Sequence, residues 1–332
     1  MSSSEAPPRV GIVGVGAIGM THVRAWQANG VTPAAIAELN EDALKRVAGE
    51  LGAKPFQSAA DMIASGEIDV VSLCTPPFTH QDLVERAIEA DLAIICEKPL
   101  AHTLESAEAI QRMVSASGTL LTVGFCHRFQ PQVEVMRQMI ADGAIGTPMM
   151  FRNRFAGHKA DAATTWFSNP AMSGGGPMMD TSVHSVDLFR HLMGDAVHVS
   201  ALTSTRETEL GPALETEDTA AMLLQSADGT IGVIESSWRT PVPEWRVTIH
   251  GTGGALDLDY STLTLRHCPM GGEWVNVAVP EGDRFTREIA HFIEVWRGNA
   301  DLRVTVEDGV AANRILDAAY RAASNPTRIT IP

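Results

Sequence analysis

Between about residues 9 and 124, short apolar runs alternate with segments whose apolar residues recur at helical spacing. The runs are RVGIVGVG (9–16), TPAAIAE (32–38), IDVVSLC (68–74), LAIICE (92–97) and TLLTVGF (119–125). The helical segments between them cover 21–30, 40–52, 80–90 and 103–118. Strands that are apolar throughout are typical of a sheet with helices on both faces, and their alternation with helices indicates crossover connections. This part of the chain is predicted to form a doubly wound parallel sheet.

After about residue 145 the pattern changes to longer β-rich runs in which apolar and polar residues alternate. These runs cover 197–207, 218–239, 244–259 and 262–267, and the turn signals Asp228-Gly229 and Gly253-Gly254 divide the second and third of them. Helical patterns lie over 177–193, 284–297 and 305–323. Alternation predicts an open, mostly antiparallel sheet with one face in solvent or covered by a partner. The second part is therefore predicted to be an α+β domain.

The composition is that of a globular protein. The chain has 332 residues, enough for two domains, with 45% hydrophobic and 20% charged residues. No apolar run approaches the roughly 18 residues that span a bilayer, and the start of the chain lacks the features of a secretory signal. A net charge of −15 without a Lys/Arg cluster argues against nucleic acid and anionic membranes as partners. We expect a cytoplasmic protein that acts on a small molecule.

The four cysteines are far apart and form no CxxC pair. Cys74, Cys96 and Cys126 lie in apolar runs or next to them, and Cys268 follows a β-rich run. They are expected to be free thiols, mostly buried, in a reducing compartment. The spacing supports no structural zinc site, and no metal is expected.

A Gly-rich turn, Gly14-x-Gly16-x-x-Gly19, follows the first predicted strand directly and opens a helix. In a dinucleotide-binding loop the first glycine permits a tight turn, the second admits the pyrophosphate and the third lets helix pack on strand. Ala17 and Ile18 would then supply N–H groups of the helix N-terminus to the phosphates. The alternative is a purely structural glycine turn, but the strand–turn–helix context favours dinucleotide binding.

Glu38 ends the second apolar run, about 20 residues beyond the glycines. An acidic side chain at this place accepts hydrogen bonds from the adenosine ribose and repels a 2′-phosphate, which favours NAD over NADP. Asn40 and Lys45 keep NADP possible. The alternative is an ordinary solvated charge at a strand end.

The end of the run 68–74 carries candidate cofactor-binding residues, because ligands of open α/β sheets bind at the carboxyl ends of strands. Thr75 and Pro76 follow the run 68–74, and His80 opens the next helix. The alternative for Pro76 is that it only ends the strand, and the alternative for His80 is a purely structural role.

The run 92–97 ends in Glu97, Lys98 and Pro99. A lysine just after a buried strand, close to the cofactor, is suited to proton exchange because burial lowers its pKa. Glu97 is either an ion-pair partner or a ribose contact, and Pro99 fixes the turn that aims Lys98. The alternative is an ordinary surface lysine at a strand end, without a role in catalysis.

Residues 174–194, GGGPMMDTSVHSVDLFRHLMG, join three glycines to a helical pattern. Asp180 and His184 are four apart and so share a helix face, with Asp187 one turn further. Such residues are often only solvated surface. Together with Lys98 and the nucleotide loop, they are interpreted as the second half of an active site.

These motifs, in this order, resemble the Gfo/Idh/MocA oxidoreductase family. The matching pieces are GIVGVGAIGMTH, VVSLCTPPFTHQDLVERAIEADLAIICEKPLAHTLESAEAI, GFCHRFQP and GGGPMMDTSVHSVDLFRHLMG, which cover most of residues 9–194. The resemblance implies an NAD(P)-dependent sugar or cyclitol dehydrogenase. Its catalytic lysine falls on Lys98, and its aspartate and histidine fall on Asp180 and His184. Relatives often carry Asn in place of His127 and Asp in place of Glu38.

The resemblance also implies a domain plan and an assembly. We expect a disordered lead-in over 1–8, a Rossmann dinucleotide-binding domain over 9–125, and an α+β domain over 126–332 that binds substrate and forms a homo-oligomer, dimer or tetramer, through its sheet. Polar and aromatic candidates for contact with a polyhydroxylated ring are Lys98, His127, Arg128, Arg152, Asn153, His158, Trp166, Asp180 and His184. Apart from Lys98, Asp180 and His184, these could equally be surface or core residues.

The predicted reaction is hydride transfer between NAD, or NADP, and a secondary alcohol or ketone of a sugar, sugar derivative or inositol. His184 is the expected general base because the ordinary pKa of histidine is close to working pH. Lys98 would bind the reacting oxygen, although the two roles are exchangeable, and Asp180 would either fix a neighbouring hydroxyl or tune Lys98. The alternatives are a reductase or dehydrogenase of a non-sugar substrate, such as an imine or semialdehyde, and a non-catalytic NAD(P)-binding sensor.

Overall fold

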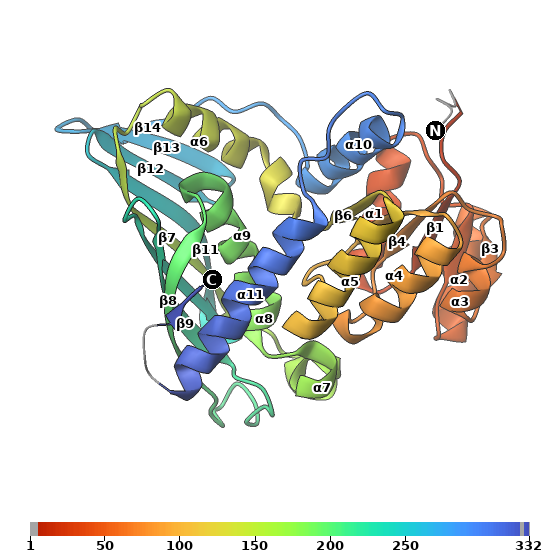
Figure 1. The fold of residues 1–332 in the computed structure, drawn as a ribbon. Coiled ribbons are helices and arrows are strands. Elements are labelled where there is room, and N and C mark those ends of the chain that lie inside the picture. The colour runs from red at the N-terminus through yellow and green to blue at the C-terminus, as the bar shows by residue number, and fades with distance from the viewer. Residues whose placement is uncertain (1–5, 326–328, 332) are drawn as a thin grey trace. The chain divides into compact units, whose positions relative to one another are not determined.

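The computed structural model describes residues 6–325 and 329–331 (Figure 1). Residues 1–5 of the expected lead-in lie outside this range. The chain divides into two compact units, one formed by residues up to 129 together with 282–310, and the other by 130–281 together with the residues from 311 onward. The first boundary lies close to the expected one at 125/126. The return of 282–310 to the first unit is a feature that the sequence pattern did not indicate.

The first unit is built on a parallel six-stranded sheet in the order β3-β2-β1-β4-β5-β6, which is the Rossmann order. Its strands are β1 Val10–Val13, β2 Ala35–Ala37, β3 Lys54–Phe56, β4 Val70–Leu73, β5 Ala93–Cys96 and β6 Leu121–Val123. Its helices are α1 Ala17–Ala28, α2 Glu41–Leu51, α3 Ala59–Ile63, α4 His80–Glu89, α5 Leu104–Ser117 and α10 Arg284–Trp296, with short 3₁₀ turns η1 Pro77–Thr79 and η2 Cys126–Phe129.

Local sequence explains where these helices begin and end. Asn40 and Thr103 accept the N-cap hydrogen bonds of α2 and α5, and both helices end in glycines with positive φ. α10 returns to α1, where Phe292 packs edge-on against Trp26 at 6.3 Å and joins the same apolar core. This packing is the physical reason that 282–310 belongs to the first unit.

The second unit carries an open sheet whose described strands run in the order β14-β13-β12-β11-β7-β10-β9-β8-β15. They are β7 Pro148–His158, β8 Ala196–Ser204, β9 Thr219–Ser226, β10 Ile231–Ser237, β11 Arg239–Gly251, β12 Gly254–Asp259, β13 Thr264–Pro269, β14 Val275–Asn276 and β15 Ile329–Thr330. β7 pairs with β10 in parallel, and the other pairs are antiparallel. Together the two sheets confirm the expected fold class.

One face of this second sheet is covered by helix α9 (Ser182–Met193). Phe189 of α9 meets Phe151 of β7 edge-on at 5.5 Å, and Gly232 of β10 leaves room for it, because a Cβ there would lie 2.7 Å from the Phe189 ring. The predicted helix over 177–193 is present as α8 (Pro177–Asp180) and α9, with Thr181 between them. The remaining helical segments of the unit are α6 Pro131–Ala141, η3 Ala162–Thr164, η4 Trp166–Ser168, α7 Pro170–Ser173 and most of α11 Val306–Ser324.

The cysteines agree with expectation. Cys74, Cys96 and Cys126 are buried free thiols, Cys268 is partly exposed, and burial raises the pKa of the first three. Among the described residues, no helix is long and apolar enough to cross a membrane.

Candidate active site

The glycine loop after β1 has the close contacts that its sequence requires. Gly14 has φ of +83°, and a Cβ on Gly19 would lie 1.9 Å from the Gly14 carbonyl oxygen, so helix α1 packs tightly on the turn. At Gly16, in contrast, a Cβ would meet no atom within 4 Å. Gly16 is also the N-cap of α1, which begins at Ala17 and has no side-chain cap. The N–H groups of Ala17 and Ile18 therefore belong to a helix N-terminus of the kind that binds phosphate.

The Glu38 carboxylate is held beside this loop. Its Oε2 accepts a hydrogen bond from the Val15 N–H at 2.9 Å, and its Oε1 accepts one from the Asn40 N–H at 2.9 Å. Glu38 is thus an oriented group and not an unconstrained surface charge. Lys45 was one of the residues that left NADP binding possible, and its Nζ lies 3.1 Å from a carboxylate oxygen of Glu41.

His80 links the turns that follow β4 and β5. Its Nε2 lies 2.9 Å from the Thr75 carbonyl oxygen, and its Nδ1 lies 3.1 Å from the Leu100 carbonyl oxygen and 3.2 Å from that of Pro99. The ring is wholly buried, and burial lowers the pKa of His80. His80 therefore acts on the Lys98–Pro99 turn through the backbone and has no exposed surface with which to touch a cofactor.

Pro76 and Thr75 shape the other side of that link. The Thr75 hydroxyl lies 2.7 Å from the Thr79 hydroxyl, which also donates to the Pro76 carbonyl oxygen at 2.8 Å. These bonds close the turn directly after β4, at the carboxyl edge of the parallel sheet. Gly14 is close by, since a Cβ on it would lie 3.3 Å from Cγ2 of Thr75.

Glu97 points into the protein and serves as an ion-pair partner. It is 4% exposed; its Oε1 lies 3.0 Å from Nε2 of His22, and its Oε2 accepts the Lys98 backbone N–H at 3.1 Å. Gly124 makes space for this carboxylate, because a Cβ there would lie 2.7 Å from Oε1. The contact orients the backbone of Lys98 at the end of β5.

His22 is charged in this setting. Burial opposes the charge, but Cys74 and Glu97 outweigh it, so the pKa of His22 is raised well above its ordinary value. Burial raises the pKa of the Cys74 thiol, and the neighbouring His22 opposes that rise. His22 and Glu97 thus form a buried ion pair, and its glutamate holds the backbone N–H of Lys98.

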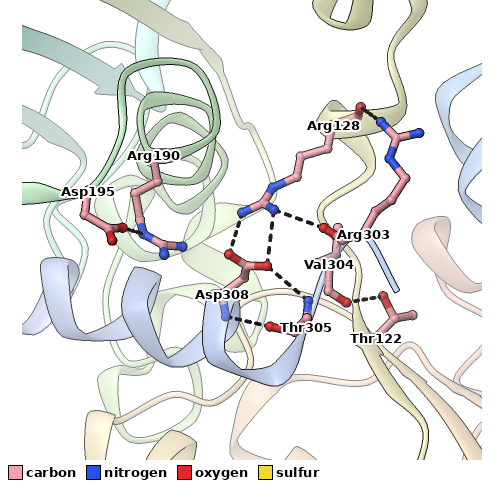
Figure 2. Close-up of polar contacts among 8 residues, drawn as sticks. All are labelled: Thr122, Arg128, Arg190, Asp195, Arg303, Val304, Thr305 and Asp308. Atoms are coloured by element: carbon pink, nitrogen blue, oxygen red, sulfur yellow. Dashed lines mark hydrogen bonds and ion pairs between the residues drawn. The ribbon is translucent and has the colours of Figure 1, made fainter. Parts of the chain in front are cut away.

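The segment Cys126–Phe129 supplies two predicted substrate contacts with different surroundings. Figure 2 shows Arg128 in a bidentate ion pair with Asp308, at 2.8 and 3.2 Å, and donating to the Arg303 carbonyl oxygen at 3.2 Å. Its side chain is 8% exposed, so the guanidinium is used to anchor the start of α11. His127 is buried, and burial together with the positive charges of Arg284 and Lys98 lowers its pKa well below the ordinary value. The structure therefore brings a neutral His127 near Lys98.

In the second unit, Asp180 and His184 lie on either side of the α8–α9 junction. Asp180 is the last residue of α8, and His184 belongs to the first turn of α9, where its N–H donates to the Thr181 carbonyl oxygen at 3.2 Å. Both side chains are partly buried. Two hydrogen bonds fix the junction to the sheet. The Ser182 hydroxyl donates to the Ser236 hydroxyl at 2.8 Å, and the Trp238 indole N–H donates to the Thr181 hydroxyl at 3.3 Å.

The other predicted substrate contacts are scattered over the second unit. Arg152 lies on the sheet face opposite α9 and pairs with Glu235 at 2.7 Å. Asn153 is wholly buried and donates to the Arg246 carbonyl oxygen, and His158 is exposed at the end of β7. Trp166 stacks on its neighbour Phe167 at 3.9 Å. The sheet therefore separates Arg152 from Asp180 and His184.

Sequence reasoning did not single out three buried or partly buried residues that contact the segments around the predicted site residues: His22, Glu217 and Tyr320. His22 lies within the predicted helix 21–30, among its buried residues, and a histidine on an apolar helix face was a signal that it has a buried partner. No spacing rule connects residue 22 with residue 97. Glu217 and Tyr320 carry no local motif.

Comparison with known families gives two matches in chain order. Residues 8–125 match a model described as an oxidoreductase family with an NAD-binding Rossmann fold, and residues 133–257 match the GFO/IDH/MocA C-terminal domain. Among curated proteins, an inositol 2-dehydrogenase of Rhizobium meliloti (strain 1021) is 29% identical, over 97% of this chain and 99% of its own. A D-apiose dehydrogenase of Paraburkholderia graminis is 27% identical, over 94% and 86%.

Solved structures agree with these matches over nearly the whole chain. A levoglucosan dehydrogenase in complex with NADH has a TM-score of 0.89 at 26% identity, covering 98% of this chain and 99% of its own. A structure described as a putative myo-inositol dehydrogenase from Sinorhizobium meliloti 1021 has a TM-score of 0.82 at 28% identity, with coverage of 98% and 99%.

Proposed function

Because the chain belongs to the Gfo/Idh/MocA oxidoreductase family and carries its NAD-binding Rossmann fold, we propose that it is a dehydrogenase of a sugar, sugar derivative or inositol. The hydride would pass between NAD and a secondary alcohol or ketone of that substrate. The relatives named for inositol, apiose and levoglucosan support a polyhydroxylated substrate class. The observation that carries the proposal is the placement of Lys98: it follows a buried strand at the carboxyl edge of the parallel sheet, with its backbone N–H held by Glu97.

The residues around the glycine loop fit NAD. Gly16 leaves open space where a Cβ would stand, and the N-terminus of α1 behind it has no side-chain cap. The oriented Glu38 carboxylate suits the two ribose hydroxyls of NAD and disfavours a 2′-phosphate by charge repulsion. Bound NAD would accept the hydride from the alcohol carbon.

The chain's own residues would handle the hydroxyl proton. His184 is proposed as the general base and Lys98 as the group that binds the reacting oxygen and stabilises its developing negative charge. Asp180 would accept a hydrogen bond from a neighbouring hydroxyl and so set the orientation of the ring. His127, held neutral near Lys98, adds a hydrogen-bonding group without adding positive charge.

A substrate panel tests this proposal. Polyols, aldoses and inositols are each combined with NAD and with NADP, and the absorbance of the reduced nicotinamide is followed. Turnover of at least one of these compounds, with NAD preferred, is the expected result. Imines and semialdehydes are tested in parallel with NADH and NADPH, and turnover of these compounds alone would replace the sugar class by a non-sugar substrate. NAD binding without turnover of any of these compounds would favour the non-catalytic sensor.

We also propose that the chain forms a homo-oligomer through the sheet face opposite α9. Exposed apolar side chains of β7, β8 and β9 lie on that face: Met150 (43% exposed), Leu202 (66%) and Leu223 (53%). Beside them lie charges of both signs, including Arg152 and Glu235. A second copy of the same face would bury the apolar residues, and the mixed charges allow self-complementary pairing.

A further inference from the structure

One oxygen of Glu217 receives three hydrogen bonds from two separate parts of the second unit. Glu217 lies just before β9, and its Oε1 accepts the backbone N–H groups of Gly176 and Met178, each at 3.0 Å, and the Tyr320 hydroxyl of α11 at 2.8 Å. The carboxylate thereby ties the start of α8 to the last long helix of the chain.

This contact leads directly to Asp180. The carbonyl oxygen of Gly176, whose N–H is held by Glu217, accepts the N–H of Asp180 at 3.0 Å. Gly176 is the N-cap of α8 and has no side chain to cap it, so the Glu217 carboxylate takes over that role. Because α8 has only four residues, fixing its first turn fixes the residue at its end.

The same contacts explain two of the three consecutive glycines. A Cβ on Gly175 would lie 1.8 Å from the Tyr320 hydroxyl oxygen, and one on Gly176 would lie 1.8 Å from the Glu217 carbonyl oxygen. Neither glycine has positive φ, so backbone conformation does not demand them. The glycines are needed for close packing against Glu217 and Tyr320.

The protonation of Glu217 and Tyr320 is consistent with a stable hydrogen bond between them. Burial raises the pKa of Glu217, while the Gly176, Tyr320 and Met178 donors oppose that rise. Burial and the Glu217 carboxylate raise the pKa of Tyr320 well above its ordinary value, so the tyrosine keeps its proton and remains the donor.

We propose that Glu217 and Tyr320 are positioning residues for the substrate-binding aspartate, Asp180. They touch neither substrate nor NAD, and act by holding Gly176 and Met178. This inference rests on the proposed function, because the role of Asp180 is part of it.

Three variants and one control test the proposal. Glu217→Ala removes all three acceptor contacts, Glu217→Gln keeps an acceptor oxygen without charge, and Tyr320→Phe removes a single donor. Asp228→Ala is the control, since Asp228 also accepts side-chain and backbone hydrogen bonds in the same unit but lies in the β9–β10 turn. Amide hydrogen exchange of peptides covering residues 174–181 is measured beside kcat, substrate KM and the Kd of NAD.

Glu217→Ala is expected to speed exchange in residues 174–181 and to lower kcat by about 10²-fold, the cost of a misplacement of roughly 1 Å. The Kd of NAD should stay unchanged, because the glycine loop belongs to the first unit. Glu217→Gln should recover most of the lost kcat. Tyr320→Phe should lose about five- to tenfold, the value of one hydrogen bond. Asp228→Ala should leave kcat unchanged.

Unchanged exchange in Glu217→Ala would disprove the contact itself. Faster exchange with wild-type kcat would disprove the positioning role, as would an equal loss of kcat in Asp228→Ala. If Glu217→Ala does not fold, Tyr320→Phe decides by the same two readouts. Absence of turnover by the wild-type protein would instead be a failure of the proposed function, and the exchange measurement would still decide whether Glu217 holds residues 174–181.

Discussion

The Nε2 of His22 lies 3.0 Å from Oε1 of Glu97, and the two side chains are only 1% and 5% exposed. The histidine belongs to helix α1, which follows the glycine loop, and the glutamate directly follows strand β5. The other oxygen of the glutamate accepts the Lys98 N–H. The pair therefore joins the helix that opens the NAD site to the lysine proposed for catalysis.

Replacing His22 should make stability depend differently on pH. The pKa of His22 is raised in the folded protein, so its stabilising contribution is complete below the unfolded value of about 6.5 and is lost as pH rises through the folded value. We expect His22→Gln to lower the free energy of unfolding by about 3 kcal/mol at pH 6, by leaving Glu97 without its charged partner. The deficit should shrink toward alkaline pH.

Urea unfolding of wild type and variant at several pH values between about 6 and 9 measures this deficit. His158→Gln, at an exposed histidine, is the matched control and should show little difference at any pH. A deficit that is constant or grows with pH would contradict the charged state assigned to His22.

Two glycines of the loop should respond differently to alanine. In Gly19→Ala the new Cβ would lie 1.9 Å from the Gly14 carbonyl oxygen, so the variant should lose about 2 kcal/mol of stability. In Gly16→Ala the Cβ meets no protein atom within 4 Å, so Tm without NAD should stay near the wild-type value while the Kd of NAD rises. Thermal unfolding with and without NAD distinguishes the two. An unchanged rise of Tm with NAD in Gly16→Ala would remove Gly16 from the phosphate site.

Glu38 should control the choice of nucleotide. Glu38→Ser removes the carboxylate that repels a 2′-phosphate, and we expect the ratio of kcat/KM for NAD to that for NADP to fall by at least about tenfold. Glu50→Ser removes an exposed carboxylate near the other end of helix α2, away from Lys45, and serves as the control. An unchanged ratio in Glu38→Ser would show that nucleotide choice is made elsewhere.

A charge placed on the open sheet face should weaken the proposed oligomer. Leu223→Glu introduces a carboxylate among exposed apolar side chains and is expected to shift the protein toward monomer in light scattering coupled to size exclusion. Leu39→Glu changes an equally apolar exposed residue in the first unit and should leave the mass unchanged. A wild-type protein that is monomeric at micromolar concentration, or a Leu223→Glu variant of unchanged mass, would contradict this use of the face.

Patterns that repeat along the chain were sufficient for most of the fold. The apolar runs of the first sheet were predicted because burial on both faces leaves no polar positions. β7 was not predicted, although it lies in the middle of the second sheet, because Arg152 and Arg154 interrupt its apolar pattern. Those arginines lie on the face opposite α9 and pair with Glu235, a contact made by a strand distant in sequence.

Predictions for the site were most specific where chemistry is local and least specific where it depends on folding. The glycine loop and Glu38 follow from spacing alone. Whether Arg128 faces a substrate or Asp308, 180 residues away, depends on tertiary packing that no local pattern encodes. The same is true of His22, whose partner is 75 residues distant.

The central claim is that Lys98 and His184 carry out acid–base chemistry on a substrate alcohol next to bound NAD. The most direct measurement is kcat of Lys98→Ala and His184→Ala on the substrate found by the panel, beside the Kd of NAD for each variant. We predict losses of kcat of about 10²- to 10⁴-fold with NAD binding retained. Variants that bind NAD normally and turn over that substrate at the wild-type rate would contradict the proposed chemistry.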